Sequence, residues 1–151
     1  MPIRRAKESD LLHLSQLIAR SIHALNAGDD SPADLAYISS RHDEQNLRRD
    51  LQRREMFVLE VEGQVIGTTS LGDDKLHSLY VEPSRTKKGY GRTLVTHIET
   101  VARNHGITLL KVSSSRTAVP FYEKLGFQKL NFEPREFAST WAMEKRLTPA
   151  S

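Results

Sequence analysis

The sequence contains no cysteine, only one tryptophan and no long apolar run. The absence of cysteine excludes disulfides, thiolate metal sites and a cysteine nucleophile. No apolar stretch approaches the roughly 20 residues that a membrane-spanning helix needs. The first residues also lack the apolar core of a signal peptide. We therefore expect a cytoplasmic protein with no membrane partner.

The sequence also lacks a large excess of one sign of charge, because 22 Lys and Arg are offset by 19 Asp and Glu. The formal net charge is +3. A nucleic-acid binder usually carries a larger and segregated basic surplus, so we expect no nucleic-acid partner. The 151 residues, 38% of them hydrophobic, suit one globular domain with a single core. We place this domain at residues 1–147, followed by a short tail at 148–151.

The first half of the chain reads as a strand, several helices and three further strands. A short strand at 3–6 precedes a helix in which apolar residues recur every three or four positions. Residues 27–54 are expected to form one or two surface helices, one of them capped by Ser31 with Pro32 in its first turn. Strands at 56–61, 65–71 and 76–81 should be sequential and antiparallel, with a hairpin turn between the first two.

The most informative stretch is residues 81–95. An apolar strand ends in Pro83, a basic loop with two glycines follows, and an amphipathic helix then begins. The first turn of a helix has unpaired N–H groups and the positive end of the helix dipole, so it attracts phosphate. The pattern predicts a phosphorylated ligand at residues 86–92.

The second half adds one more crossover. The helix after the glycine loop leads to a strand at 107–112, which should therefore lie parallel to the strand at 76–81. A helix at 117–125 follows. Segments 127–130 and 137–147 are expected to close the sheet as a strand pair.

Two blocks of this sequence resemble the GNAT superfamily of acyl-CoA-dependent N-acetyltransferases. The first block is LYVEP at 79–83 with KGYG at 88–91 and Leu94, and the second is AVPFYEKLGF at 118–127. Both chain ends, at 3–6 and 143–147, also match. The resemblance implies an α/β (α+β) single-domain GNAT fold. Its sheet is mixed and mostly antiparallel, with a splayed parallel central strand pair and helices on both faces.

The resemblance also implies acetyl-CoA as the co-substrate. The glycine loop would hold the pyrophosphate, and the pantetheine arm would lie between the two splayed strands. The implied contact residues are Leu79, Tyr80, Val81, Thr86, Lys87, Lys88, Gly89, Tyr90, Gly91, Arg92, Thr93, Ser115, Ala118 and Phe121. Thr86 and Ser115 depart from the family pattern, which usually has Arg or Gln at the first position and often Asn at the second.

Tyr122 occupies the position at which the family usually has the acid that protonates the leaving thiolate. A phenol with an ordinary pKa near 10 stays protonated at neutral pH; core packing beside Phe121 is the alternative. His77 is a candidate base, expected on the same strand face as Leu79. Packing, or a chain of waters in place of a single base, is its alternative. The six histidines show no metal-ligand pair at helical spacing, so we expect no metal.

These residues lead us to expect an N-acetyltransferase that moves an acetyl group from acetyl-CoA to a primary amine directly, in a ternary complex. A small-molecule amine is the favoured acceptor; a protein amine and a catalytically reduced coenzyme A sensor are the alternatives. Residues 27–38 and the last strand pair should line the amine site. Within them, Asp29, Asp30 and Asp34 could attract a cation or form a solvated acidic loop. Tyr37, Phe137 and Trp141 could form aromatic walls, but Phe137 and Trp141 should alternate along a strand, so core packing is equally natural. The resemblance leaves a homodimer open.

Overall fold

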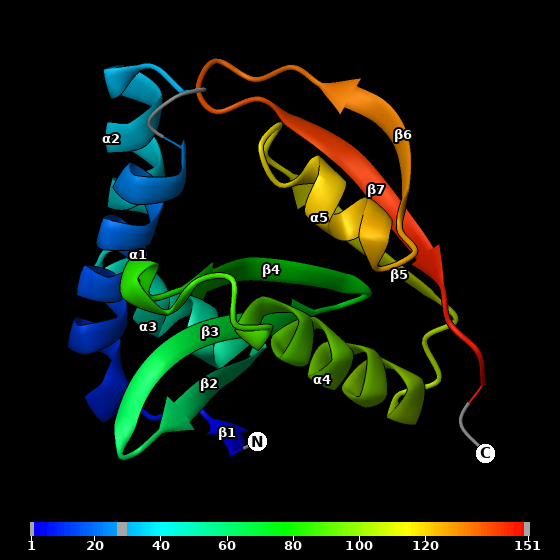
Figure 1. Cartoon of the computed structure of the whole chain (residues 1–151), viewed down its shortest axis with the longest axis horizontal. Coiled ribbons are helices and arrows are strands. Elements are labelled where there is room, and N and C mark those ends of the chain that lie inside the picture. Colours follow the sequence, from blue (N-terminus) through cyan, green and yellow to red (C-terminus); the bar gives the residue numbers. More distant parts are fainter. Residues whose placement is uncertain (1, 27–29, 150–151) are drawn as a thin grey trace.

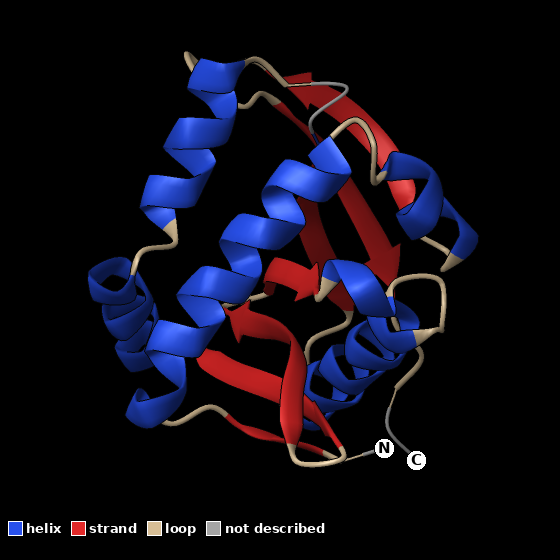
Figure 2. Ribbon diagram, turned by 60° about the vertical axis from the view of Figure 1, so that its left-hand side comes forward, coloured by secondary structure: helices blue, strands red, loops and turns tan. Residues whose placement is uncertain are grey.

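The computed structural model of the chain describes residues 2–26 and 30–149. A seven-stranded sheet in the order β1-β2-β3-β4-β5-β7-β6 forms its centre (Figures 1 and 2). The strands are β1 Ile3–Arg5, β2 Glu55–Val61, β3 Gln64–Gly72, β4 Lys75–Val81, β5 Leu109–Ser114, β6 Gln128–Glu133 and β7 Thr140–Arg146. The α-helices are α1 Leu11–Asn26, α2 Pro32–Arg41, α3 Glu44–Arg53, α4 Tyr90–Asn104 and α5 Val119–Lys124. Two 3-10 turns, Glu8–Asp10 and Pro83–Arg85, precede α1 and follow β4.

The sheet is antiparallel except at its centre, where β4 and β5 run parallel. Their pairing comprises only Lys75 with Lys111 and Leu76 with Val112. Beyond these pairs the two strands separate (Figure 1), and β5 pairs with β7 along its whole length. The predicted mixed sheet with a splayed parallel pair is therefore confirmed.

Helices cover both faces of the sheet because successive strand residues point to opposite sides. Met56 and Val58 of β2 pack against α1, α2 and α3 in one apolar cluster. Phe57, between them, belongs to the cluster on the other face, which α4 and α5 cover. In the described part of the chain, no helix is both long and apolar enough to cross a bilayer.

The segment after the undescribed residues 27–29 forms two helices. Ser31 caps α2 as predicted, since its Oγ accepts the Asp34 N–H at 3.1 Å and the Asp34 carboxylate accepts the Ser31 N–H in return. Asp43 caps α3 in the same way, accepting the Asn46 N–H at 2.8 Å. Of the one or two surface helices predicted for this segment, the structure contains two.

The structure corrects three predicted boundaries in the second half. The strand expected at 107–112 lies at Leu109–Ser114, and the helix expected at 117–125 begins at Val119. Phe137 lies outside β7, because residues 134–139 form a loop in which Ser139 Oγ accepts the Arg135 N–H at 2.9 Å. Phe137 and Trp141 therefore do not alternate along a strand. Instead, Phe137 stacks on Tyr37 of α2, with ring centroids 5.4 Å apart.

Candidate active site

The glycine loop ends in an exposed helix N-terminus. Gly89 caps α4 with φ of +81°, a left-handed conformation that favours glycine. The first backbone bond of the helix runs from the Thr93 N–H to the Gly89 carbonyl at 3.0 Å. The N–H groups before Thr93 have no helical acceptor, so this end of α4 can receive an anion.

The side chains of the loop divide into two groups. Lys87, Lys88 and Arg92 are exposed and carry the positive charge. The two threonines bond within the loop: Thr86 Oγ1 donates to the Pro83 carbonyl at 3.2 Å and Thr93 Oγ1 to the Gly89 carbonyl at 2.9 Å. Thr86, one of the departures from the family pattern, therefore supports the turn rather than adding a cation.

The first turn of α4 approaches α5 closely at Gly91. A Cβ on Gly91 would lie 3.2 Å from the Phe121 ring, so glycine permits this approach. At the N-terminal end of α5, Ser115 Oγ accepts the Ala118 N–H at 3.3 Å. The structure thus brings Gly91, Phe121, Ala118 and Ser115 to one end of the gap between β4 and β5.

The second half of β4 has a free main-chain edge. The Glu82 N–H donates to the Ile66 carbonyl of β3 at 2.7 Å. Because alternate residues of a strand turn their main-chain groups to opposite neighbours, those of Leu79 and Val81 point toward β5. Within the described sheet, β5 pairs with β4 only at Lys75 and Leu76. The main chain at Leu79 and Val81 is therefore available to a ligand.

A β-bulge in β4 changes the expected position of His77. Thr68 pairs with Tyr80 and Ser70 with His77, so β4 has one residue more than β3 over this interval, and Ser78 takes a left-handed φ of +54°. His77 consequently shares a face with Tyr80, on the side of α1 to α3. The predicted common face with Leu79 was wrong, since the extra residue reverses the alternation.

His42 is a second histidine beside the bulge, and sequence reasoning missed it. Its Nδ1 lies 2.8 Å from the Ile38 carbonyl, which can only accept, so Nδ1 carries the proton. Its Nε2 then accepts from Ser78 Oγ at 3.0 Å. The His42 ring also meets Tyr80 edge-on at 5.2 Å, and burial lowers the pKa of His42. It therefore ties α2 to the bulge as a neutral imidazole.

Tyr122 lies buried on α5. Its ring makes edge contacts with Phe121 and Phe127, at centroid distances of 5.1 and 5.4 Å. Burial, and then the nearby Tyr80, raise the pKa of the Tyr122 phenol. The hydroxyl therefore stays protonated well above neutral pH, as a proton donor requires.

His77 is half-buried, and the pKa of His77 falls to about 4 through burial, Arg54 and Lys75. Between about pH 4 and the ordinary histidine pKa of about 6.5, the unfolded chain binds more protons, so stability falls as pH falls through this window. When the pH falls from 7 to 5, the free energy of unfolding should drop less in His77→Gln than in the parent chain. The difference should be about 1 kcal/mol after allowance for solvent screening. Urea unfolding at both pH values measures this. An identical pH dependence in both proteins would contradict the position of His77.

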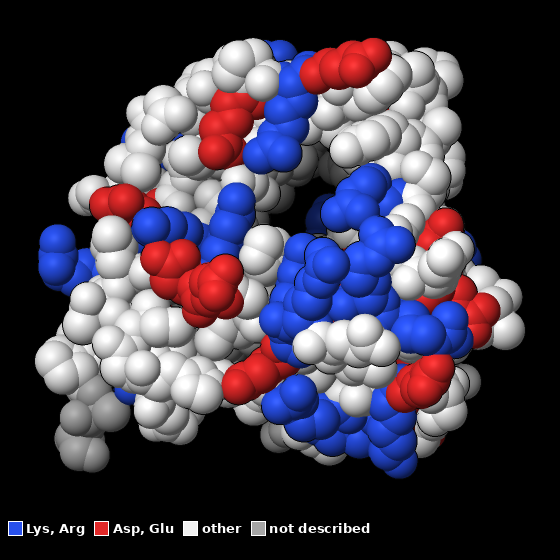
Figure 3. Space-filling model, turned by 180° about the vertical axis from the view of Figure 1, so that it is seen from behind, with Lys and Arg blue, Asp and Glu red and all other residues white. Residues whose placement is uncertain are grey.

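A second opening lies on the side of α2. Asp34 Oδ1 accepts the Ala138 N–H at 3.0 Å, and the stacked Tyr37 and Phe137 join α2 to the β6–β7 loop beside it. We call these two contacts the arch. Seen from behind, the molecule is deeply hollowed in this region, and Lys and Arg gather next to the hollow (Figure 3). Of the acidic residues predicted to attract a cation, Asp34 is engaged in the arch, and Asp29 lies outside the described residues.

Glu133 is a carboxylate that sequence reasoning did not single out. Its Oε1 accepts from Ser113 Oγ at 2.9 Å and from Thr140 Oγ1 at 2.8 Å. Burial alone would raise the pKa of Glu133, but these hydrogen bonds hold it below its ordinary value. No group of three His, Asp or Glu residues in the described chain is placed to hold a metal ion.

Comparison with known proteins identifies the arrangement. Residues 26–147 match the model of the acetyltransferase (GNAT) domain. Glucosamine 6-phosphate N-acetyltransferase of Trypanosoma brucei brucei is 27% identical over 144 residues, covering 85% of this chain and 89% of the relative. The uncharacterized N-acetyltransferase YafP of Escherichia coli is 24% identical, with 92% and 89% covered.

Solved structures share the fold over nearly the whole chain. A GCN5-related N-acetyltransferase from Rhodopseudomonas palustris superposes with a TM-score of 0.91 at 26% identity, covering 97% of this chain and 95% of that one. The PaiA N-acetyltransferase of Thermoplasma acidophilum, in complex with coenzyme A, gives 0.83 at 24% identity, with 96% and 98% covered. The chain therefore belongs to the GNAT superfamily and is an acyl-CoA-dependent N-acetyltransferase with acetyl-CoA as its co-substrate.

Proposed function

We propose that the chain transfers the acetyl group to the primary amine of a small molecule, directly and within a ternary complex. One observation carries the proposal: the free edge of β4 lies between two openings. The glycine loop and α5 border the first opening, and α2 with the β6–β7 loop borders the second. The two substrates can then meet at Leu79 and Val81 from opposite sides.

The residues at the first opening fit coenzyme A. The unpaired N–H groups at the start of α4 and the exposed Lys87, Lys88 and Arg92 suit the phosphates. The main-chain groups of Leu79 and Val81 suit the amides of the pantetheine arm, which would add to β4 as an extra strand does. Phe121, Ala118 and Ser115 would border the arm on the side of α5.

Acetyl-CoA supplies an activated thioester carbonyl when it is bound. A main-chain N–H near Leu79 to Val81 donates to the carbonyl oxygen as negative charge develops there. Tyr122 donates its hydroxyl proton to the departing sulfur. The attacking amine must be neutral, and its proton passes to water, since His77, with a pKa of about 4, is a weak base at neutral pH. The amide bond forms as the thioester bond breaks, and the phenolate regains a proton from solvent.

The arch supports a small acceptor over a protein. It joins α2 to the β6–β7 loop through Asp34 with Ala138 and Tyr37 with Phe137. A folded protein would have to open both contacts to reach β4, whereas a small amine can pass beside them. The trypanosomal relative, whose name specifies an amino sugar phosphate, adds support for a small amine.

A screen of amines tests the function. We expect thiol release from acetyl-CoA to depend on small primary amines, with mass spectrometry showing acetylated product. Short peptides with free N-termini should react at least about 10-fold more slowly, because the arch hinders them. Tight acetyl-CoA binding with no amine-dependent thiol release would favour the sensor, and faster reaction with peptides would favour a protein amine.

A further inference from the structure

Arg54 directly follows α3, and the stem of its side chain lies over β3 and β4. The Arg54 N–H donates to the Asp50 carbonyl at 2.8 Å. A Cβ on Gly72 would lie 2.9 Å from Arg54 Cγ and 3.3 Å from His77 Cδ2. The missing side chain at Gly72 therefore lets Arg54 and His77 lie side by side over β3 and β4.

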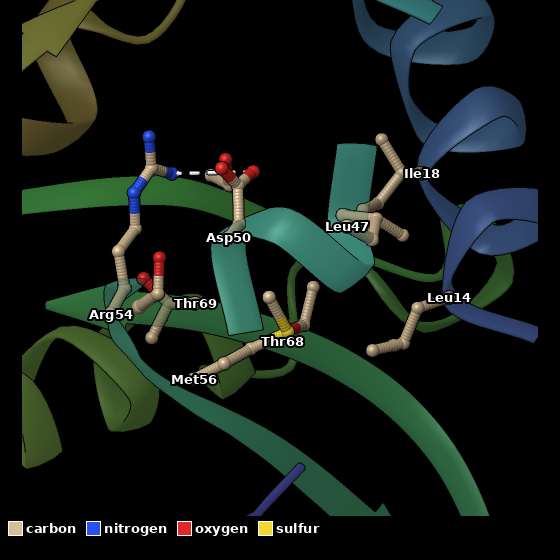
Figure 4. Close-up of a pocket in the computed structure, with 10 residues that line it drawn as sticks. Leu14, Ile18, Leu47, Asp50, Arg54, Met56, Thr68 and Thr69 are labelled. Atoms are coloured by element: carbon tan, nitrogen blue, oxygen red, sulfur yellow. Dashed lines mark ion pairs between the residues drawn. The ribbon is translucent and has the colours of Figure 1, made fainter. Parts of the chain in front are cut away.

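The Arg54 guanidinium points away from the apolar residues around it. A cavity of about 10 Å³, room for about one water molecule, separates α1 and α3 from the sheet, and Leu14, Ile18 and Leu47 line one end. Arg54 and Asp50 stand at the other end (Figure 4). The guanidinium of Arg54 is thus directed away from the apolar core.

The positive charge of Arg54 is poorly compensated. Its side chain is only 20% exposed, and within the described chain its one ion-pair partner is Asp50, at 3.6 Å. A guanidinium has five N–H donors, and a charge removed from water is costly unless it is paired. Burial lowers the pKa of Arg54 against the opposing effect of Asp50, and Arg41 and Arg53 lower it further. These surroundings favour an additional anion.

The same charges surround the histidines at the bulge. Arg54 and Lys75 both lower the pKa of His77, and Arg41 and Arg54 contribute to lowering that of His42. Arg41, Arg54 and Lys75, the cationic cluster, therefore act on the two imidazoles that border the bulge. Glu133 offsets part of the charge of Lys75, and Arg41 is exposed to solvent. Arg54 instead combines a largely buried side chain with a single ion-pair partner in the described chain.

We propose that the acceptor amine carries an anionic group, a carboxylate or a phosphate, and that Arg54 binds this group within the cationic cluster. The planar guanidinium matches two oxygens of either group with two parallel N–H donors. The Lys and Arg next to the hollow in Figure 3 are consistent with an anionic acceptor. This inference rests on the proposed acetyl transfer to a small amine and specifies its substrate class.

Matched amines test the inference. We use glucosamine 6-phosphate against glucosamine, and an amino acid against its amide. With the parent chain, kcat/KM for at least one anionic amine should exceed that of its uncharged counterpart by about 30-fold or more, the effect of a charge-assisted pair. Arg54→Gln should remove that advantage by raising KM for the anionic amine. It should leave kcat/KM for the uncharged amine within about threefold of the parent value. Arg54→Lys should give an intermediate loss, because it keeps the charge without the fork.

Arg49→Gln is the matched control, since Arg49 lies exposed on α3, the helix that Arg54 follows, and within the described residues its side chain bonds only Asn46, at 3.4 Å. It should leave both kinetic constants unchanged. Equal kcat/KM for the charged and uncharged amines would overturn the anionic acceptor. So would an equal loss of kcat/KM for both amines in Arg54→Gln at an unchanged melting temperature. Either result would leave the proposed acetyl transfer intact. Acetylation of neither member of any pair would instead count against the proposed function.

Discussion

Replacing Tyr122 with phenylalanine is expected to lower kcat by about 100-fold or more, the usual contribution of a general acid, while the Kd for acetyl-CoA changes by less than about twofold. The substitution removes only the hydroxyl. The ring keeps its edge contacts with Phe121 and Phe127, so the core beneath the site is preserved. Loss of turnover would then report the missing proton donor.

Steady-state turnover with an accepted amine and calorimetric titration with acetyl-CoA measure the two effects separately, and the melting temperature controls for folding. Because burial raises the pKa of Tyr122 above the ordinary phenol value of about 10, ionisation of this group should not lower the rate between pH 7 and 10. Unchanged turnover in Tyr122→Phe would leave Tyr122 with a packing role only.

The sequence allowed the local elements to be predicted where their signals are local. The cap at Ser31, the turn between β2 and β3, and the glycine loop before α4 each depend on a few adjacent residues, and the structure contains all three. The parallel pairing of β4 with β5 followed from the helix that connects them.

Single-residue irregularities could not be predicted. The bulge at Ser78 adds one residue to β4. The consecutive polar residues His77 and Ser78 interrupt the apolar alternation, but such a pair does not by itself specify a bulge. His77 consequently points to the face opposite the expected one. Similarly, the aromatic residues around Phe137 suggested a longer strand, but a loop held by Ser139 and Arg135 places it against Tyr37.

Residues that act through distant contacts were also missed. His42 bonds Ser78, 36 positions away, and Ser113 bonds Glu133, 20 positions away. Arg54 looked like one more charge on a charged surface helix. Its significance depends on burial against Gly72 and His77, which only the tertiary structure supplies.

A second large effect is expected at the glycine loop. Gly89 and Gly106 flank the two ends of α4 with φ of +81° and +79°, and a Cβ on either would meet no atom within 4 Å. Valine at either position should therefore cost similar stability, about 1–3 kcal/mol of backbone strain. Only Gly89→Val should also weaken acetyl-CoA binding, by about 30-fold or more, because it places a branched side chain and a distorted turn where the phosphates would dock.

The most direct test of the account is an NMR titration of the ¹⁵N-labelled chain with acetyl-CoA, repeated with Gly89→Val and Gly106→Val. The account predicts that amide signals of residues 86–92 and those of Leu79 and Val81 shift together in the parent chain and in Gly106→Val, and that Gly89→Val needs far more ligand. Shifts confined to another surface, or equal affinities for the two variants, would contradict it.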